Sequence, residues 1–258
     1  MLRRMLLSAA MVGAFAGLAK AAPQDDINAA LQKLADSPSY SWKTTTEGGF
    51  GAGETDGKTQ KDGPTTLLTI TRQDATYQVV IQGDKAAAKT DDGWKSTDEL
   101  TAAATAAGGQ GGGAPGPERI LSMAIQNFKT PVAIAQAAVG GLQNIQQTND
   151  VYAADLSDDA AKQALMFRRR PQNADASAAP ANAPTVSNAK ASVKIWIEDG
   201  AVSKIENHVT GTVSFNGNDR DIDRTTTTVF SDVGSTVVAI PDDAKAKLTA
   251  AAAPTTQP

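Results

Sequence analysis

The clearest alternation of apolar and polar residues lies near the C-terminus. From Ala191 to Glu198 every second side chain is apolar, which is the period of a β-strand with two unlike faces. A second run, Ile205 to Phe215, precedes Asn216-Gly217, the dipeptide that a tight type I′ turn favours because both positions need positive φ. A third run, Asp221 to Phe230, contains β-branched threonines at 225–228. The pattern predicts three antiparallel strands.

The turn at residues 198–200 determines how the first two of these strands pair. A two-residue turn would place Ile195 opposite Lys204 and so mix the apolar and polar faces, which is unfavourable. A three-residue loop with its glycine in the left-handed conformation instead pairs Val193 with Ile205. We therefore predict the three-residue loop.

Earlier in the chain the pattern predicts one helix and four strands. The helix ends before Ser37-Pro38, and its apolar residues recur at the spacing of one helical face: Ile27, Ala30, Leu31 and Leu34. The strands form an antiparallel meander: 39–47, 65–72, 76–82 and 85–90. Residues 48–63 are rich in glycine and charged side chains, which predicts an exposed, flexible loop. Gly57 lies in this loop, so Gly57→Val is expected to cost less stability than Gly200→Val.

Helix start signals predict a helical stretch in the middle of the chain. Residues 96–99 form a capping box, and Pro117 and Pro131 occupy first helical positions, where proline is tolerated. The apolar face that follows the first of these prolines consists of Ile120, Leu121, Ala124, Ile125 and Phe128. Residues 142–156 are then expected to be extended around a turn, and Ser157 is expected to cap a further helix.

Length and composition favour one domain. The chain has 258 residues, of which 41% are hydrophobic and 5% aromatic, enough for one sizeable core. We expect a single domain from 22 to 250 and a disordered tail at 251–258. The segments 108–116 and 171–185 lack apolar periodicity and are expected to be flexible. The glycines at 108–113 do not follow a strand, so the run does not indicate a dinucleotide-binding loop.

Residues 1–21 have the three parts of a secretory signal peptide. Arg3-Arg4 precedes an apolar run at 5–18 and small residues at 19–21. We expect cleavage after Ala21, with retention as an uncleaved anchor as the alternative. The chain contains no cysteine, which excludes disulfides and a lipid anchor on an N-terminal cysteine. Its net charge is −4, and losing the basic residues of the signal makes it more acidic, which does not favour nucleic acid as a partner.

No set of residues identifies a reaction. The single histidine, His208, lies on the polar side of a strand, and without cysteine a zinc site is not indicated. The oxygen-rich segment Asn216 to Asp223 raises calcium as an alternative, but it lacks the terminal glutamate of an EF-hand and a hairpin accounts for it. Acidic pairs at 25–26, 91–92 and 158–159 stand at helix starts or turns, where capping and solvation account for them. We therefore predict no enzyme, no cofactor and no metal site.

Five short stretches, spread over most of the chain beyond residue 21, carry a family resemblance: Gly83-Asp84-Lys85, Asp92-Gly93-Trp94-Lys95, Val151 to Leu165, Trp196 to Gly200 and Phe230 to Pro241. In these stretches the chain resembles the LolA/LppX superfamily of exported lipoprotein and lipid carriers. The resemblance implies an α+β fold in which a curved antiparallel sheet, an unclosed β-barrel, is covered or plugged by helices. It also implies that the concave face holds acyl chains. Without a lipid-anchoring cysteine, the chain is similar to the free periplasmic shuttles of that family.

Two functional hypotheses follow. The first is an exported soluble carrier for a lipid, a lipoprotein acyl chain or another apolar ligand, held between the sheet and the helices. The candidate wall residues are Trp42, Ile70, Val79, Ile81, Trp94, Ile125, Phe128 and Ile134. The alternative is an envelope interaction or structural protein with a packed half-barrel and no ligand. We expect a periplasmic or secreted monomer whose partner is an apolar small molecule or lipid, with an envelope protein as a second candidate and no nucleic acid.

Overall fold

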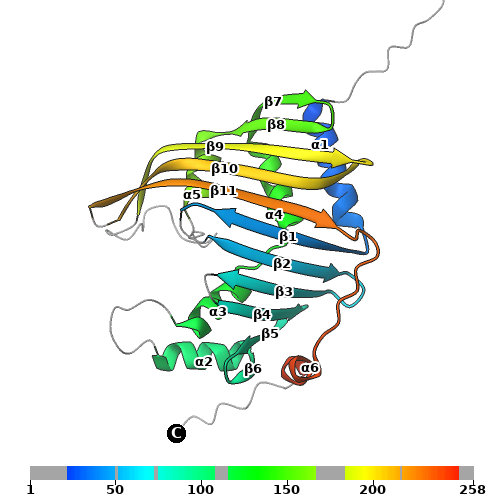
Figure 1. Cartoon of the computed structure of the whole chain (residues 1–258), viewed down its shortest axis with the longest axis vertical. Helices are drawn as coiled ribbons and strands as arrows, with labels where there is room; N and C mark the ends of the chain where they lie inside the picture. The colour runs from blue at the N-terminus through cyan, green and yellow to red at the C-terminus, as the bar shows by residue number, and fades with distance from the viewer. Residues whose placement is uncertain are drawn as a thin grey trace, which may run out of the picture.

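The computed structural model describes residues 22–49, 52–72, 75–107, 116–166, 184–215 and 217–249. Over these residues the fold is α+β, as expected: eleven strands form one antiparallel sheet that does not close, and helices cover it (Figure 1). The expected signal segment at 1–21, the tail at 251–258 and most of the linkers at 108–116 and 171–185 lie outside the described residues.

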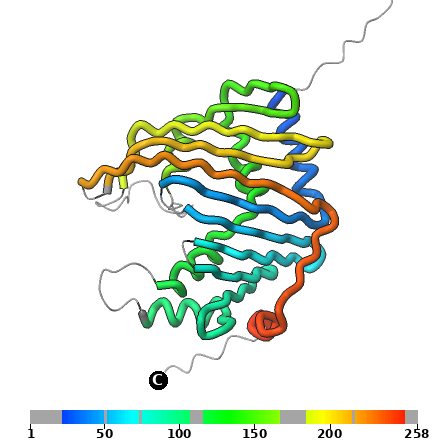
Figure 2. Tube along the Cα trace, in the orientation of Figure 1, coloured from blue at the N-terminus to red at the C-terminus, as the bar shows by residue number. Residues whose placement is uncertain are grey.

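The sheet consists of two meanders. The first contains β1 (Ser39–Glu47), β2 (Gly53–Gln60), β3 (Thr65–Arg72), β4 (Ala75–Gln82), β5 (Lys85–Thr90) and β6 (Gly93–Ser96). The second contains β7 (Leu142–Thr148), β8 (Val151–Leu156), β9 (Thr185–Glu198), β10 (Ala201–Phe215) and β11 (Asn218–Ser231). They join where β1 pairs with β11, so that Trp42 lies opposite Phe230. Figure 2 shows this junction, with the blue N-terminal strand beside the orange C-terminal one.

Helices cover the concave face of the sheet. They are α1 (Pro23–Asp36), α2 (Thr97–Ala107), α3 (Pro117–Gln126), α4 (Pro131–Ala138) with the short 3-10 turn η1 (Val139–Gly141), and α5 (Asp158–Leu165). The expected apolar stripe of α1 is confirmed, because Ile27, Leu31 and Leu34 are fully buried in the main core. That core also takes Tyr40 from β1 and Leu121 from α3, so helices from both halves pack onto one continuous apolar face.

A sixth helix covers the opposite face. Helix α6 (Asp242–Thr249) packs on β5 and β6, where Ala244 and Leu248 contact Val80, Ala87 and Trp94. The sequence analysis did not predict α6 because its eight residues include only three other than Asp, Lys and Thr. The short strand β6 was also not predicted.

The prediction of a flexible loop at 48–63 is wrong, because residues 53–60 form strand β2 between β1 and β3. The strand has no aliphatic or aromatic side chain to produce an alternating pattern. Backbone pairing on both sides holds it, and neighbouring side chains fill its inner face, so that Gly57 and Thr59 are buried. The expected four-stranded meander therefore has six strands.

The prediction of a three-residue loop at 198–200 is also wrong. Glu198 pairs directly with Ala201, which leaves a two-residue turn in which Asp199 and Gly200 have φ of 50° and 72°. A two-residue turn with regular pairing would place Ile195 opposite Lys204 and mix the apolar and polar faces. A β-bulge three residues after the turn prevents this. Ser203 is the extra residue between Val202 and Lys204, and it brings Ile205 opposite Ile195. The positive φ expected for the glycine is confirmed.

Local helix signals were predicted well. In the capping box, the Ser96 backbone N–H donates to Glu99 Oε2 at 2.7 Å, and the Glu99 N–H donates to Ser96 Oγ at 3.3 Å. Ser157 caps α5 by accepting from the Ala160 N–H at 3.4 Å. These signals depend only on residues three positions apart, which is why the sequence is sufficient to find them.

Candidate ligand-binding cavity

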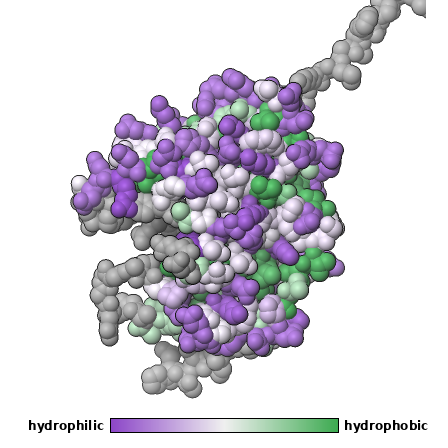
Figure 3. Space-filling view, viewed as in Figure 1, coloured by the Kyte–Doolittle hydropathy of each residue, from purple (hydrophilic) through white to green (hydrophobic). Residues whose placement is uncertain are grey.

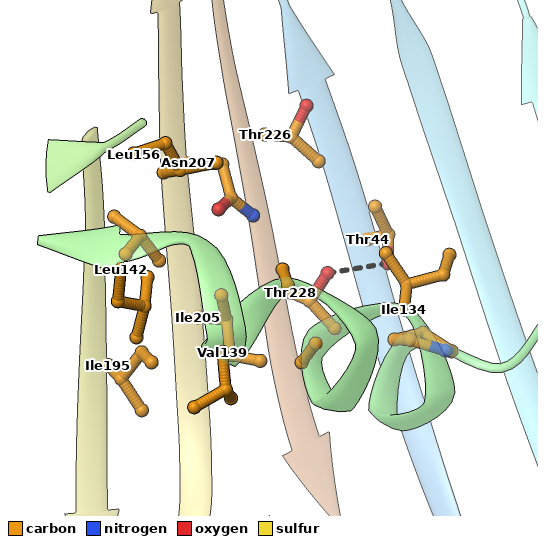
Figure 4. Close-up of a pocket in the computed structure, with 14 residues that line it drawn as sticks. Thr44, Ile134, Val139, Leu142, Leu156, Ile195, Ile205, Asn207, Thr226 and Thr228 are labelled. Atoms are coloured by element: carbon orange, nitrogen blue, oxygen red, sulfur yellow. Dashed lines mark hydrogen bonds between the residues drawn. The ribbon is translucent and has the colours of Figure 1, made fainter. Parts of the chain in front are cut away.

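A cavity of about 170 Å³ lies between helix α4 and the concave face of the sheet (Figure 4). The helical side is formed by Pro131, Ile134, Ala135, Ala138 and Val139. The apolar part of the sheet side is formed by Leu142, Leu156, Val193, Ile195 and Ile205. The cavity therefore spans the second meander and its junction with β1. Its walls are mostly aliphatic, as in typical sites for apolar ligands.

Helix α4 is short and rich in alanine, and this leaves space beneath it. Thr130 caps the helix by accepting from the Ala133 N–H at 3.3 Å, and Pro131 occupies the first turn. Val132 is its one buried residue, whereas Ala135 and Ala138 face the cavity with a single methyl group each. Longer side chains at these two positions would fill the space, so the small residues of α4 create the cavity.

Polar side chains attach α4 to helix α1. Gln136 donates from Nε2 to Gln32 Oε1 at 3.3 Å, and Gln24 donates to the Val139 carbonyl at 3.2 Å. Ile134 is at the rim of the cavity and 52% exposed, which is unusual for a large aliphatic residue that also lines an interior space. The helix is thus held over the cavity by these hydrogen bonds and by the burial of Val132 in the main core.

Hydroxyl groups form part of the sheet side of the cavity. Thr44 on β1 pairs with Thr228 on β11, and their hydroxyl oxygens are 2.9 Å apart (Figure 4). Thr46 and Thr226 form a second pair at 3.4 Å. In each pair one hydroxyl donates to the other, so each of these hydroxyls has one partner.

One amide completes the polar part of the wall. Asn207 on β10 lies opposite Thr226 and lines the cavity (Figure 4). Its side-chain amide makes no hydrogen bond to another described residue. None of the described residues that line the cavity is charged.

The nearest cation on the same face of β11 is Arg224, two positions before Thr226. Its Nη2 donates to the Ala164 carbonyl of α5 at 2.7 Å, and burial lowers the pKa of its guanidinium. Burial likewise raises the pKa of Tyr40. Neither side chain lines the cavity, so its interior is uncharged.

The sequence-based wall residues occupy three different places. Ile134 lines the cavity. Trp42 and Val79 are buried in the main core, and four others pack against it without lining the cavity: Ile70, Ile81, Ile125 and Phe128. Trp94 is on the opposite face, against α6. Residue alternation identifies a buried face, but it does not tell which part of a curved sheet is filled by helices and which part is left open.

Several cavity residues were missed by the sequence analysis. Ile195 and Ile205 could have been found, because their alternation places them on the apolar face of the strands predicted there. Thr44, Thr228 and Asn207 gave no comparable signal, since threonine and asparagine are equally typical of a solvated strand face.

The His, Asp and Glu side chains that were considered as catalytic groups or metal ligands do not gather at one site in the described part of the chain. Among the described residues no group of three or more His, Asp or Glu side chains could hold a metal ion. His208 Nε2 lies 2.8 Å from Asp223 Oδ1 on the outer face, and Asp221 accepts from Thr212 at 2.8 Å. No helix in the described part of the chain is both long enough and apolar enough to cross a membrane.

The chain was compared with family models, curated proteins and solved structures. No family model and no curated protein matches the sequence. Among solved structures, the Mycobacterium tuberculosis lipoprotein LppX is 13% identical with a TM-score of 0.45, covering 83% of this chain and 96% of LppX. LprF from Mycobacterium bovis is 9% identical with a TM-score of 0.42, covering 86% of this chain and 96% of LprF. The unclosed antiparallel sheet with helices on its concave face is the architecture that the resemblance to the LolA/LppX superfamily implies.

Proposed function

We propose that this chain is a binding protein for an apolar ligand, such as a lipid or an acyl chain, which it holds between α4 and the concave face of the sheet. The observation that carries the proposal is the aliphatic cavity itself, bounded by the methyl groups of Ala135 and Ala138 and opening beside the half-exposed Ile134. In the alternative, a structural protein with a packed half-barrel, larger side chains would be expected at the two alanines.

The size of the cavity limits what fits without movement. An apolar cavity of about 150 Å³ accommodates a molecule the size of benzene, whereas pockets for drug-sized ligands are about 300 to 1,000 Å³. Burying a methylene contributes about 0.8 kcal/mol, and association costs about 4 kcal/mol or more, so useful affinity requires a chain of many carbons. We infer that a long chain enters as α4 moves outward, which breaks the Gln136–Gln32 hydrogen bond and part of the packing of Val132, the one buried residue of the helix.

A titration with a fluorescent acyl probe tests the proposal. Ala135→Phe places an aromatic ring in the cavity and should weaken binding at least tenfold, while the melting temperature stays close to that of the wild type. Ala137→Phe is the matched control, because Ala137 is exposed on the same helix and does not line the cavity. Equal affinities for the two variants, or no saturable binding by the wild type, would favour the packed structural protein. Mass spectrometry of organic extracts of the purified protein would identify a natural ligand.

We also propose that the protein is exported and acts in the periplasm or outside the cell. The support is the three-part pattern at residues 1–21, with Arg3-Arg4, an apolar run and small residues before Ala22. An apolar ligand has low solubility in water, so a carrier in an aqueous compartment is a consistent role. N-terminal sequencing of the protein from an envelope fraction tests the cleavage, and a chain there that still begins at Met1 would contradict it and favour the anchored alternative. Absence of the protein from the envelope and the medium would contradict export.

A further inference from the structure

The polar groups of the cavity are all on the sheet side, and all are neutral. Asn207 and Thr226 face each other across β10 and β11, and the Thr44–Thr228 pair lies next to them. Opposite them, the helix contributes only hydrocarbon side chains. A bound molecule therefore meets two different surfaces, one purely apolar and one with hydrogen-bonding groups.

These groups have hydrogen-bonding capacity to spare. A carboxamide has two N–H donors and an acceptor oxygen, and the amide of Asn207 uses none of them with another described residue. A threonine pair uses one of its two O–H donors internally, so the Thr44–Thr228 pair has a second donor and free lone pairs. The cavity can thus both donate to and accept from a ligand.

A charged ligand group would lack a counter-ion at this position. Moving an ionised carboxylate or ammonium group out of water is costly unless an opposite charge compensates it. Arg224 is the nearest cation on the inner face of β11, but it does not line the cavity and its guanidinium donates to the Ala164 carbonyl. A neutral ester, amide or hydroxyl has a much smaller desolvation cost, which hydrogen bonds to Asn207 and the threonines can offset.

We propose that the cavity selects amphiphiles whose polar group is uncharged, and that Asn207 is the residue that determines this specificity. The inference rests on the proposed function and deepens it by naming the ligand class: an alkyl or acyl chain that carries a neutral hydrogen-bonding group, and not a free fatty acid anion. The chain lies against α4, and the neutral group lies against Asn207, Thr226 and the neighbouring hydroxyls.

Four probes with the same eight-carbon chain test this selectivity by calorimetric titration at pH 7: octan-1-ol, N-octylacetamide, octanoate and octylammonium. The two neutral probes should bind at least tenfold more tightly than the two ionised ones. Asn207→Leu should weaken the neutral probes about three- to tenfold, the range that one lost hydrogen bond produces. Asn207→Asp, which adds a negative charge, should move the preference to octylammonium. A purely structural role of Asn207 would not produce this last change.

His208→Leu is the control, because it makes a similar change at the adjacent position on the outer face of β10 and should leave the order of the four probes unchanged. Octanoate binding as tightly as octan-1-ol would overturn the inference, as would an Asn207→Asp variant with unaltered preferences. If the acyl probe of the previous section binds but the polar groups are not discriminated, only this inference fails. If no probe binds at all, the proposed function fails with it.

Discussion

The indole ring of Trp42 lies directly over Gly57 on the neighbouring strand. A β-carbon added at Gly57 would come within 2.1 Å of the ring, so the absence of a side chain is what leaves room for the indole beside β2. The same indole packs against Tyr40 with the ring centroids 5.7 Å apart. Strand β2 has no large apolar side chain of its own, and a neighbour's aromatic ring covers its inner face instead.

Gly57→Val should therefore destabilise the protein more than Gly200→Val, the reverse of the order expected from the sequence. At Gly57 the indole must be displaced from the core, and such overpacking typically costs about 1 to 3 kcal/mol or more. At Gly200 the nearest atom to an added β-carbon is Lys33 Nζ at 3.5 Å, so the cost comes from the positive φ alone, about 1 to 2 kcal/mol. Urea unfolding of the two variants measures the difference. A larger loss for Gly200→Val would contradict the position of the indole.

Leu31→Ala should reduce the free energy of unfolding by about 2 to 5 kcal/mol, because Leu31 is fully buried between α1 and the sheet and its removal leaves a cavity. Asn28→Ala on the exposed side of the same helix is the control and should change the free energy by less than about 0.5 kcal/mol. Similar losses for both variants would mean that α1 is not anchored by its apolar stripe.

The contact between Glu99 and Lys247 should make stability depend on pH. Lys247 Nζ donates to Glu99 Oε1 at 2.6 Å, and this hydrogen bond, with that from the Ser96 backbone, lowers the pKa of Glu99. A carboxyl group whose pKa is lower in the folded state stabilises the fold above its unfolded pKa of about 4.3, and the contribution disappears as the pH falls through the folded pKa. Wild type should therefore be more stable than Glu99→Gln at pH 7, with a difference that shrinks below about pH 4. Urea titrations at a series of pH values measure it, and a difference that does not vary with pH would contradict the assignment.

Fixing α4 to α1 should prevent long ligands from binding. The chain has no cysteine, so Gln32→Cys with Gln136→Cys introduces one defined pair of thiols where the two glutamines are hydrogen-bonded. Joining them with a short bis-maleimide should abolish binding of a long-chain acyl probe but not of a benzene-sized one, since only the former needs α4 to move. The same double variant without the reagent is the control. Unchanged binding of the long probe after crosslinking would show that it enters by another route.

Sequence alone was sufficient where a feature depends on near neighbours. The turn expected within residues 142–156 forms at Asn149, which has a φ of 52°, and the caps at Ser96 and Ser157 form as predicted. Prediction failed where the outcome depends on the other half of the chain. The sequence around Gly57 predicts a loop unless the indole above this glycine is known. Thr44 gives no sign that it borders a cavity until β11 is placed beside it.

Figure 3 shows the surface on one side of the molecule. Hydrophilic residues cover most of the face seen in Figure 3, and hydrophobic residues gather along the edge where the segment from β11 to α6 runs. In that segment Val233 and Val237 are 44% and 74% exposed. The cavity is on the other side of the sheet, so a substitution at these valines should not affect ligand binding.

The pairing of β1 with β11 means that the chain must be nearly complete before the floor of the cavity exists. Thr44 and Thr228, which share a hydrogen bond there, are 184 positions apart. During synthesis β1 is available long before its partner, and its unpaired edge can meet other chains in the meantime. Contacts of such long range also slow folding, because the loop between them must be closed first. A protein cut short before residue 218 would retain every helix that covers the concave face, yet it would have neither the joined sheet nor a place for a ligand.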